Sequence, residues 1–388
     1  MKKDIWANRK LGDIADIIMG QSPNGNSIND TEGIEFHQGK LAFGDKYLEH
    51  SNNYTSKPTK IALAHSLLLC VRAPIGTLNV TEREVCIGRG LCAINANNQT
   101  SNPFLYYALS NQQNYFEENA TGSMFKAIST ALIKGTRIPL PPLDVQQAIV
   151  NYLDKKTGQI DKSISLLEAQ KADLLAYRKA IISETVTKGL NPNVNLKDSG
   201  ISWIGETPEH WTIIPLKRCA IANSGKEVSK EIERDAVNAV PVYGSGGVFK
   251  YTNNALYCGE AVMFGRKGTI GKPLYVNAAF WAVDTMYFIT HNCECLLPKY
   301  NYYQFLVFDW NKFTTQTALP SIVANDIMKS NFSIPPISEQ QAIVDYLDSK
   351  TAKIDEAIRK IDEQISDLRS YRTALISEAV TGKIDVRP

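Results

Sequence analysis

The chain has 388 residues, a formal net charge of +2 at pH 7 and 44% hydrophobic residues, which is ordinary for a globular protein of two or three domains. Its apolar runs, such as residues 66–71, are too short to cross a bilayer, and Met1–Trp6 has no apolar signal core. The seven cysteines form no regular framework, which fits a reducing compartment. These features argue against a membrane protein, a disulfide framework and a basic nucleic-acid tail, and they predict a cytoplasmic location.

Residues 1–140 are expected to form a first globular unit. Short β-prone runs, such as residues 61–63 and 67–71, alternate with Gly and Asn turns. Residues 103–112 are predicted to form a short helix, as are residues 299–310 further along the chain. This mixture of strands and helices indicates an α+β unit.

Residues 141–190 are predicted to form one long helix. Pro141 and Pro142 end the preceding segment, because proline fixes φ and favours an extended predecessor. Asp144 and Gln147 fit a capping box with Asp144 as the N-cap, and Gly189 fits the C-terminal end. About 43 helical residues at ~1.5 Å each would span roughly 64 Å.

Residues 191–334 are expected to hold a linker followed by a second globular unit. Both globular units begin with a tryptophan, a leucine five positions later and then a glycine. These residues are Trp6, Leu11 and Gly20 in the first unit and Trp211, Leu216 and Gly225 in the second. Arg72–Gly76 and Arg266–Gly271 are a second, weaker correspondence. The globular units therefore look duplicated but far more diverged than the helices.

Residues 335–388 repeat the first helix, with identity at 26 of 47 positions compared from Pro141 and Pro335. Ser338 and Gln341 take the capping-box positions. Apolar residues recur every seven positions in both helices, as in the seam of a coiled coil. The seam comprises Leu153, Ile160, Leu167, Leu174, Ile181, Leu347, Ile354, Ile361, Leu368 and Leu375. The matched registers favour two helices packed on each other over two amphipathic helices on separate cores.

The order of these segments predicts an α+β protein with a pseudo-twofold duplication. Two α/β domains, at residues 1–140 and 191–334, are joined by two long antiparallel coiled-coil helices, at residues 141–190 and 335–388. The second helix must run back along the first, because each helix leaves one globular unit and ends near the other.

No segment carries a recognisable catalytic or cofactor motif. Gly265–Lys272 differs from a phosphate loop in spacing, and Pro273 stands where Ser or Thr is required. Tyr243–Gly247 could hold an anion, but a mobile turn is favoured. Cys293 and Cys295 could bind a metal, yet their spacing is not that of a common zinc ribbon and no partner pair is evident. The sequence therefore predicts no metal and no catalytic residue.

The duplicated plan resembles the specificity subunits of type I restriction–modification systems. The motif Pro-Pro-(Leu/Ile)-x-x-Gln-Gln-Ala-Ile-Val-x-Tyr-Leu-Asp opens each helix, at residues 141–154 and 335–348, and the resemblance covers essentially the whole chain. Arg72–Gly76, Ile87–Gly90 and Tyr243–Gly247 also resemble, more loosely, strand-and-loop segments of that family's target-recognition domains.

The resemblance implies that each globular unit is a target-recognition domain for one half of a split, asymmetric sequence in double-stranded DNA. The helices would set the distance between the halves, and this subunit would have neither catalysis nor a cofactor. The implied partners are two methyltransferase subunits, which bind S-adenosylmethionine, and restriction subunits, which use ATP and Mg to translocate and cut. The alternatives are a DNA-binding adaptor of another defence system without a methylase, and an enzyme with an unrecognised site.

Candidate DNA contacts are cationic or bidentate-capable residues beside Gly, Asn or Pro turns, where loops reach a groove or phosphates. In the first unit they are Gln21, Ser22, Lys40, Lys57, Arg72 and Arg89. In the second unit they are Ser245, Lys250, Tyr251, Arg266, Lys267 and Lys272. The alternative for each residue is an ordinary solvated surface position.

Overall fold

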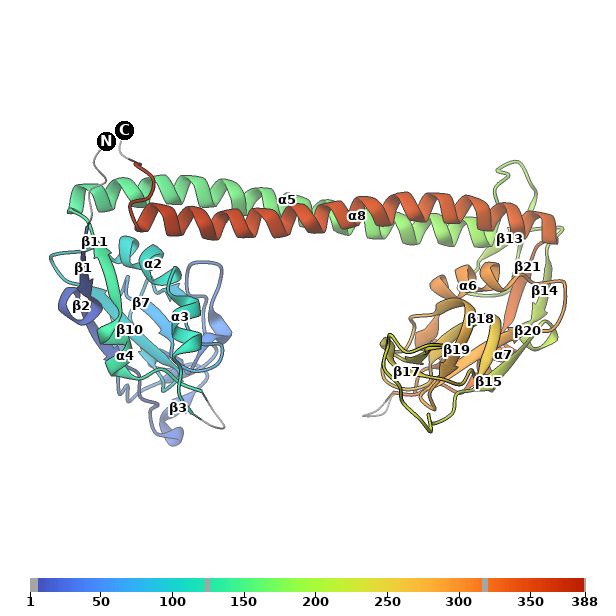
Figure 1. Ribbon diagram of the computed structural model, residues 1–388, viewed down its shortest axis with the longest axis horizontal. Helices are drawn as coiled ribbons and strands as arrows, with labels where there is room; N and C mark the ends of the chain where they lie inside the picture. Colours follow the sequence, from blue (N-terminus) through green and yellow to red (C-terminus); the bar gives the residue numbers. More distant parts are fainter. Residues whose placement is uncertain (1–5, 123–125, 316–319, 387–388) are drawn as a thin grey trace. The chain divides into compact units, whose positions relative to one another are not determined.

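The chain divides into two compact units in the computed structural model, which describes residues 6–122, 126–315 and 320–386 (Figure 1). Unit 1 comprises Met1–Leu167 and Glu363–Pro388, and unit 2 comprises Glu168–Asp362. Each unit therefore combines one globular part with a segment of both long helices, whereas the sequence analysis treated these as separate segments. Met1–Ile5, which contributed to the expected absence of a signal core, lies outside the described residues.

Two long helices take up the repeated sequence: α5 covers Leu143–Lys188 and α8 covers Ile337–Val380. Gly189 and Gly382 follow them with φ of +77° and +70°, a conformation that favours glycine because it has no Cβ. A tryptophan packs on each glycine, since an added Cβ would lie 3.1 Å from Trp211 at Gly189 and 3.2 Å from Trp6 at Gly382. The tryptophans that open the two globular parts thus cover equivalent helix ends. None of the described helices is both long and apolar enough to cross a membrane.

The helix starts differ from the predicted capping boxes. Both helices begin before the predicted N-cap, so Asp144 and Ser338 lie in the first turn. Gln147 and Gln341 each donate a hydrogen bond to the side chain four residues ahead in the same helix, and not to the N-cap backbone. The prediction was wrong because the second proline of each pair already has a φ suited to a helix, so its carbonyl accepts the first helical hydrogen bonds.

The other glutamine of each pair anchors the helix start to its globular part. Gln146 and Gln340 are both 0% exposed. The Gln146 carboxamide donates to the carbonyl oxygen of Gln99 at 3.1 Å, and the Gln340 carboxamide donates to that of Cys295 at 2.8 Å. These bonds satisfy buried polar atoms that would otherwise destabilise the fold, which explains why the repeat retains both glutamines.

Within unit 2 the segments of α5 and α8 pack antiparallel. The ammonium of Lys171 lies 2.6 Å from an oxygen of Asp362, and the guanidinium of Arg178 lies 2.8 Å from one of Asp355. A step of seven residues forward along α5 is therefore a step of seven residues back along α8. Such charge pairs between exposed Asp and half-buried cations specify register more than they stabilise the helices.

The ten predicted seam residues are all buried or half-buried in their units. The exposed fraction is 0% at Leu153 and Leu347 and 5% at Ile361. In unit 1 the guanidinium of Arg372 lies 2.9 Å from an Asp161 oxygen, and this pair is the repeat equivalent of a pair in unit 2. The antiparallel register therefore recurs in both units.

A four-stranded antiparallel sheet is common to the two globular parts, and we call it the shared sheet. In unit 1 it has the order β2-β10-β7-β8, and in unit 2 the order β15-β20-β18-β19. Its strands in unit 1 are β2 (Ala15–Met19), β7 (Leu67–Cys70), β8 (Leu78–Val80) and β10 (Leu91–Ala96). Those in unit 2 are β15 (Ala220–Ser224), β18 (Tyr257–Gly265), β19 (Leu274–Ala282) and β20 (Met286–His291).

Helices and a two-stranded ribbon complete the common part of each unit. The ribbons, which lead into the long helices, are β1 (Ala7–Lys10) with β11 (Arg137–Leu140), and β14 (Thr212–Pro215) with β21 (Asn331–Ile334). The short helices are α1 (Leu11–Ile14), α2 (Asn102–Ser110), α3 (Gln113–Glu118) and α4 (Thr130–Gly135) in unit 1, and α6 (Pro298–Val307) and α7 (Ala324–Lys329) in unit 2. Helices α2 and α6 match the two short helices predicted from the sequence.

The two units differ in what is added to the shared sheet. Unit 1 has a separate five-stranded sheet, made of β3 (Ile28–Asn29), β5 (Tyr54–Thr55), β4 (Ile34–His37), β9 (Val85–Ile87) and β6 (Ile61–Ala62). Unit 2 instead extends the shared sheet beyond β19 with the hairpin β16 (Val240–Gly244) and β17 (Gly247–Thr252). Its linker forms the ribbon β12 (Leu196–Asp198) and β13 (Glu206–Pro208).

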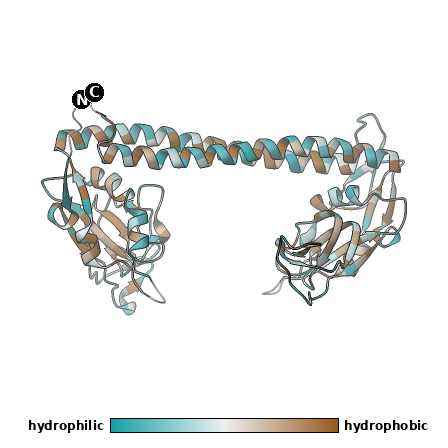
Figure 2. Cartoon of the chain, in the orientation of Figure 1, coloured by the Kyte–Doolittle hydropathy of each residue, from teal (hydrophilic) through white to brown (hydrophobic). Residues whose placement is uncertain are grey.

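Each unit has its main core between the shared sheet and the long helices. Figure 1 shows α2 and α6 between sheet and helix in their units, and Figure 2 shows hydrophobic strands beside helices of mixed hydropathy. The hydroxyl of Tyr107 on α2 donates to Asp154 at 2.6 Å, and that of Tyr303 on α6 donates to Asp348 at 2.6 Å. The predicted α+β class with long paired helices is confirmed.

Candidate nucleic-acid interface

In unit 1 several nominated residues meet at the end of the shared sheet where β2 and β7 finish and β10 begins. The backbone N–H of Gln21 donates to Ile87 O, and that of Val71 donates to Gly90 O, both at 2.9 Å. Arg89 precedes Gly90, and Arg72 follows Val71. The strand pairing thus places Gln21, Arg72 and Arg89 on adjacent segments, which we call the sheet-end site of unit 1.

Glycine permits the close backbone approaches at this site. A Cβ on Gly20 would lie 2.2 Å from the carbonyl oxygen of Gly88, and one on Gly88 would lie 3.0 Å from the Cα of Gln38. The segment around Gln38 therefore lies against the sheet end, and Ser22 Oγ donates to Gln38 Oε1 at 2.6 Å. This contact brings the nominated Ser22 to the sheet-end site.

Two nominated lysines of unit 1 lie in segments that connect strands of its five-stranded sheet. Lys40 is two residues beyond Gln38, and Lys57 follows β5; both side chains are exposed. The segment after Lys57 is tied to the sheet end because the Thr59 hydroxyl donates to the carbonyl oxygen of Gln21. The backbone therefore connects both lysines to the sheet-end site.

Unit 2 has an equivalent sheet-end site where β15 and β18 finish. Gly225 N donates to Met286 O at 3.0 Å, as Gly20 N donates to Leu91 O at 2.9 Å in unit 1. A Cβ on Gly225 would lie 1.9 Å from a carbonyl oxygen, so this position also requires glycine. The glycine of the tryptophan–leucine–glycine pattern is therefore required in both units, because a backbone carbonyl lies against it.

The nominated residues of unit 2 occupy two neighbouring loops and one strand. Arg266 N donates to Thr285 O at 2.8 Å, and a Cβ on Gly265 would lie 3.1 Å from that of Ser245. Ser245, Arg266 and the following Lys267 are therefore adjacent at the sheet end. Lys272 lies further along the loop between β18 and β19, whereas Lys250 and Tyr251 lie within β17.

The side chains of these residues differ in how far they are available to a ligand. Eight of the twelve are exposed, and Ser22, Ser245, Lys250 and Tyr251 are half-buried. The guanidinium of Arg266 lies 5.6 Å from the ring centroid of Tyr287, a cation–π contact that leaves its N–H groups able to bind phosphate. Lys250 already pairs with Glu231, so a phosphate would have to compete for it.

A β-bridge corrects the alignment of the two sites. Arg72 forms an isolated bridge with Ala127, and Lys267 forms the corresponding bridge with Ser321. The residue equivalent to Arg72 is therefore Lys267, one position after the Arg266 that the sequence comparison matched. The shift arises because the segments between the bridge partners differ by one residue in length.

Sequence reasoning missed three residues at the sheet ends: Gln38, Lys60 and Lys226. Gln38 contacts Ser22, and the carbonyl oxygen of Lys60 accepts a hydrogen bond from Ile87 N. Lys226 is exposed and follows Gly225 as Gln21 follows Gly20. The matched glycines were a sufficient signal for Lys226, but no sequence signal pointed to Gln38 or Lys60.

A polar cluster stiffens the additional sheet of unit 1. Glu35 on β4 is 8% exposed and accepts hydrogen bonds from Arg83 at 2.6 Å, His50 at 2.5 Å and His37 at 3.2 Å. Burial raises the pKa of Glu35, but these hydrogen bonds outweigh it and bring the pKa down to about 2. Burial lowers the pKa of His37, which favours its neutral ring.

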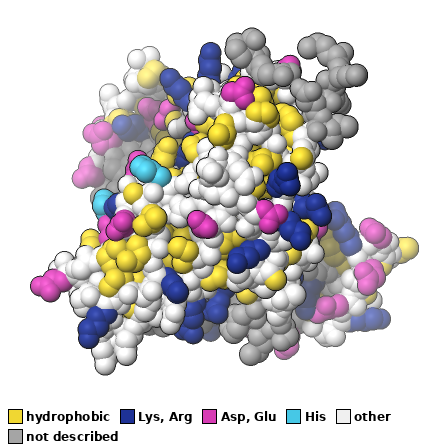
Figure 3. Space-filling model, turned by 90° about the vertical axis from the view of Figure 1, so that its left-hand side faces the viewer, with side chains coloured by type: hydrophobic (Ala, Val, Ile, Leu, Met, Phe, Trp, Pro, Cys, Tyr) yellow, Lys and Arg dark blue, Asp and Glu magenta, His cyan; other side chains and the backbone are white. Residues whose placement is uncertain are grey.

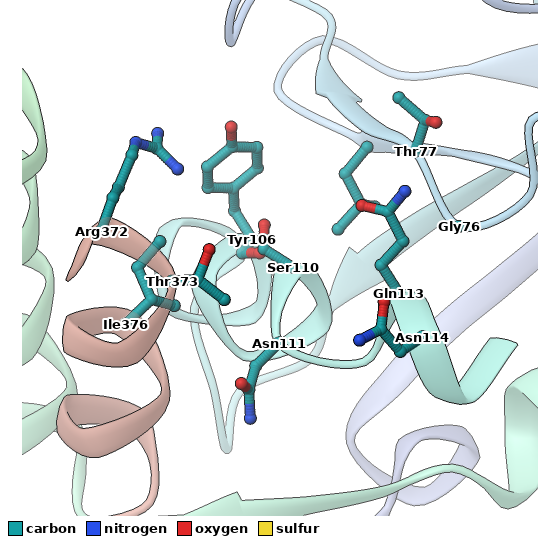
Figure 4. Close-up of a pocket in the computed structure, with 11 residues that line it drawn as sticks. Gly76, Thr77, Tyr106, Ser110, Asn111, Gln113, Asn114, Arg372, Thr373 and Ile376 are labelled. Carbon is teal, nitrogen blue, oxygen red and sulfur yellow. The ribbon is translucent and has the colours of Figure 1, made fainter. Parts of the chain in front are cut away.

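A cavity of about 370 Å³ in unit 1 is a further candidate site (Figure 4). Tyr106, Ser110 and Gln113 line it from one side and Arg372 from α8. Among the described lining residues Arg372 alone carries a charge, and it is paired with Asp161. The cavity therefore offers no acid, base or nucleophile pattern for catalysis.

Charges of both signs are mixed on one face of the molecule (Figure 3). On the face shown in Figure 3, Lys and Arg side chains lie among acidic and uncharged ones. The two units thus share one strand order and have one sheet-end site each, on repeated helices. A family model described as the type I restriction modification DNA specificity domain matches residues 3–175 and 208–366. The chain belongs to this family of non-catalytic specificity subunits, which confirms the resemblance seen in the helix motifs.

Individual relatives agree with the family assignment. The type I restriction enzyme MjaVIII specificity subunit of Methanocaldococcus jannaschii is 22% identical over 98% of this chain and 93% of its own length. A provisionally named MjaX specificity subunit of the same organism is 38% identical over 44% of this chain, a match that spans 40% of that relative. A solved structure, from work on complex assembly and conformational transition of the type I R-M system, has a TM-score of 0.77. It covers 98% of this chain and 99% of its own at 15% identity, so it supports the fold alone.

Proposed function

We propose that this chain is the sequence-recognition subunit of a type I restriction–modification complex and that each unit reads one half of a bipartite, asymmetric target in double-stranded DNA. The observation that carries this proposal is the pair of equivalent sheet-end sites. Both are built on the same strand order and the same obligatory glycine, yet they present different side chains. Two different half-sites require this combination, because direct readout depends on the particular side chains offered to base edges.

The sites combine two kinds of contact. The exposed cations, Arg72 and Arg89 in unit 1 and Arg266 and Lys267 in unit 2, suit phosphates or guanine edges. Gln21 can make a bidentate contact with adenine, whereas unit 2 has Lys226 at the equivalent position. The two units therefore differ in base-reading chemistry at matched positions.

The partners we propose are two identical methyltransferase subunits together with restriction subunits. Each unit exposes one aliphatic residue at a helix start and one tyrosine on the other long helix. Unit 1 exposes Leu143 by 52% and Tyr371 by 54%, and unit 2 exposes Ile337 by 39% and Tyr177 by 53%. Repeated apolar positions of this kind suit two copies of the same partner. S-adenosylmethionine, ATP and Mg would be bound by the partners, and this chain would bind no cofactor.

The target is found by methylation-aware long-read sequencing of the source genome, which should return a split motif with modified adenines. The purified chain, alone and with its methyltransferase partner, is then tested by fluorescence anisotropy on the motif and on duplexes with one half scrambled. We expect discrimination of roughly a thousandfold or more, with most of it lost when either half is scrambled. Equal affinity for the motif and a fully scrambled duplex would contradict the proposal, and binding without any modified adenine would indicate an adaptor of another system.

A further inference from the structure

Three cysteines of unit 2 form a cluster that the recognition function does not use. Cys219 lies just before β15, and Cys293 and Cys295 lie between β20 and α6. Their sulfur atoms are all within 4.8 Å of one another. Cys293 and Cys295 are joined by a disulfide, and the Sγ of Cys295 lies 3.4 Å from that of Cys219.

Backbone and side-chain contacts other than the disulfide hold these cysteines together. β15 pairs with β20 in a register that sets Ala220 opposite His291, and Asn292 N donates to Cys219 O at 3.1 Å. The buried carboxamide of Gln340 donates to Cys295 O at 2.8 Å. Reduction of the disulfide therefore leaves three thiols on a frame that keeps them close.

The cluster is specific to unit 2. Equivalent hydrogen bonds match Ile14 of unit 1 to Cys219 and Gln99 to Cys295, and neither these residues nor Asn97 and Asn98 before Gln99 are cysteines. Gln146 makes the anchoring hydrogen bonds of this region in unit 1 without any sulfur nearby. The thiols are thus not needed to build the frame that the two units share.

Three close thiols match the coordination chemistry of a borderline-soft d10 cation. Zn²⁺ binds thiolates at about 2.3 Å in tetrahedral geometry, which implies sulfur–sulfur separations of roughly 3.8 Å. Separations below 4.8 Å in the cluster meet this requirement after small side-chain adjustments. Cys295 is exposed and Cys219 is buried, so an ion has a path from solvent and a ligand shielded from it.

We propose that the reduced cluster of Cys219, Cys293 and Cys295 is a structural site for one Zn²⁺ ion, with solvent in the fourth coordination position. A phosphine reductant and one water convert the disulfide into two thiols and the phosphine oxide. Zn²⁺ then displaces the three thiol protons. Bound zinc ties the start of β15 to the segment that anchors α8 through Gln340. The sequence offered Cys293 and Cys295 as possible metal ligands but gave no sign of the third, because Cys219 is 74 residues from Cys293.

The test uses the full chain, reduced with a phosphine, freed of metal and kept anaerobic. Zn²⁺ is titrated in competition with a chromophoric chelator, and Co²⁺ is added separately to detect sulfur-to-cobalt charge-transfer absorption. We expect one Zn²⁺ per chain, the charge-transfer bands and a higher thermal midpoint with zinc. Removing a residue that only orients a metal ligand typically weakens metal binding about 10–100-fold. Cys295→Ser removes a ligand itself, so it should weaken Zn²⁺ binding at least about tenfold.

Cys258→Ser is the matched control, because Cys258 is an exposed thiol on β18 outside the cluster. Cys219→Ser should also weaken binding, but Cys219 is buried, so the exposed Cys295 carries the test if that variant fails to fold. No zinc uptake by the reduced wild-type chain would overturn the proposal. So would unchanged affinity in Cys295→Ser, or a loss of affinity in Cys258→Ser as large as in Cys295→Ser.

Discussion

Each unit contains its own copy of the same four-stranded sheet, and the two units differ in the strands that are added to it. Unit 1 carries a second, five-stranded sheet whose buried Glu35 is held by Arg83 and two histidines. Unit 2 instead carries the hairpin β16–β17 on the edge of its shared sheet. The glycines and the strand order at the sheet ends are the same, whereas the side chains at these ends and on the additions differ. Under the proposed function, we expect that recognition by one unit can change without disturbing the other.

Of the changes considered, the exchange of one unit should have the largest effect on the DNA target. Replacing residues 1–140 with the matching segment of a relative should change one half of the DNA target completely and leave the other half as it was. The reason is that each sheet-end site is built within its own unit. Methylation-aware sequencing of a host that carries the chimera and its methyltransferase reads out both halves. A chimera that alters both half-sites would show that the units do not read DNA independently.

Loss of a seam residue should destabilise both units by similar amounts. Leu153 and Leu347 are repeat equivalents and are both 0% exposed. Leu153→Ala and Leu347→Ala should each lower the free energy of unfolding by roughly 2–5 kcal/mol, because a cavity remains in a packed core. Chemical denaturation measures the change. Leu166→Ala, at a position that is 63% exposed, is the control, and equal effects at all three positions would contradict the seam.

Lowering the pH should destabilise the five-stranded sheet of unit 1 before it destabilises the shared sheet of unit 2. The pKa of Glu35 is about 2 in the folded chain, against an ordinary value of 4.5, so its ionised form stabilises the fold above pH 4.5. That contribution, roughly 3 kcal/mol, is lost as the pH falls from 4.5 towards 2. Hydrogen exchange of β4 should accelerate over this range before that of β18.

The matched variants for this test are Glu35→Gln and Glu32→Gln. Glu35→Gln should exchange faster in β4 even at neutral pH, because Arg83 loses its carboxylate partner, and the added acid sensitivity should disappear. Glu32 is exposed on the same segment, so Glu32→Gln should behave as the wild type. Acid sensitivity that persists in Glu35→Gln would assign it to another group.

Single cations at the sheet ends should have the smallest effects. Arg72→Gln and Lys267→Gln remove equivalent side chains, so each should lower the slope of log K against log salt by about one. If these side chains contact phosphates, each substitution should weaken binding to all DNA sequences alike. A loss of discrimination at one target position only would indicate a base contact. Lys250→Gln is the comparison, and we expect little change because Lys250 is already paired with Glu231. An unchanged salt slope for both Arg72→Gln and Lys267→Gln would remove these two residues from the interface.

Local and periodic features of this protein could be predicted from the sequence alone. The seven-residue spacing of apolar side chains, the Pro-Pro helix starts and the repeat predicted α5, α8 and their antiparallel pairing. The short helices α2 and α6 were also predicted. The predicted capping boxes were wrong, because each helix begins at the residue after the second proline and Gln147 and Gln341 bond to side chains four residues ahead.

Long-range strand pairing, by contrast, decided which residues lie together at the sheet ends and in the cysteine cluster. The order β2-β10-β7 brings Gln21, Arg72 and Arg89 to one sheet end, and Gln38 and Lys60 join them only through contacts with distant segments. The equivalence of Arg72 with Lys267, and the meeting of Cys219 with Cys293 and Cys295, depend in the same way on register. Register is set by which apolar faces are buried together across the whole unit, and no short stretch of sequence contains that information.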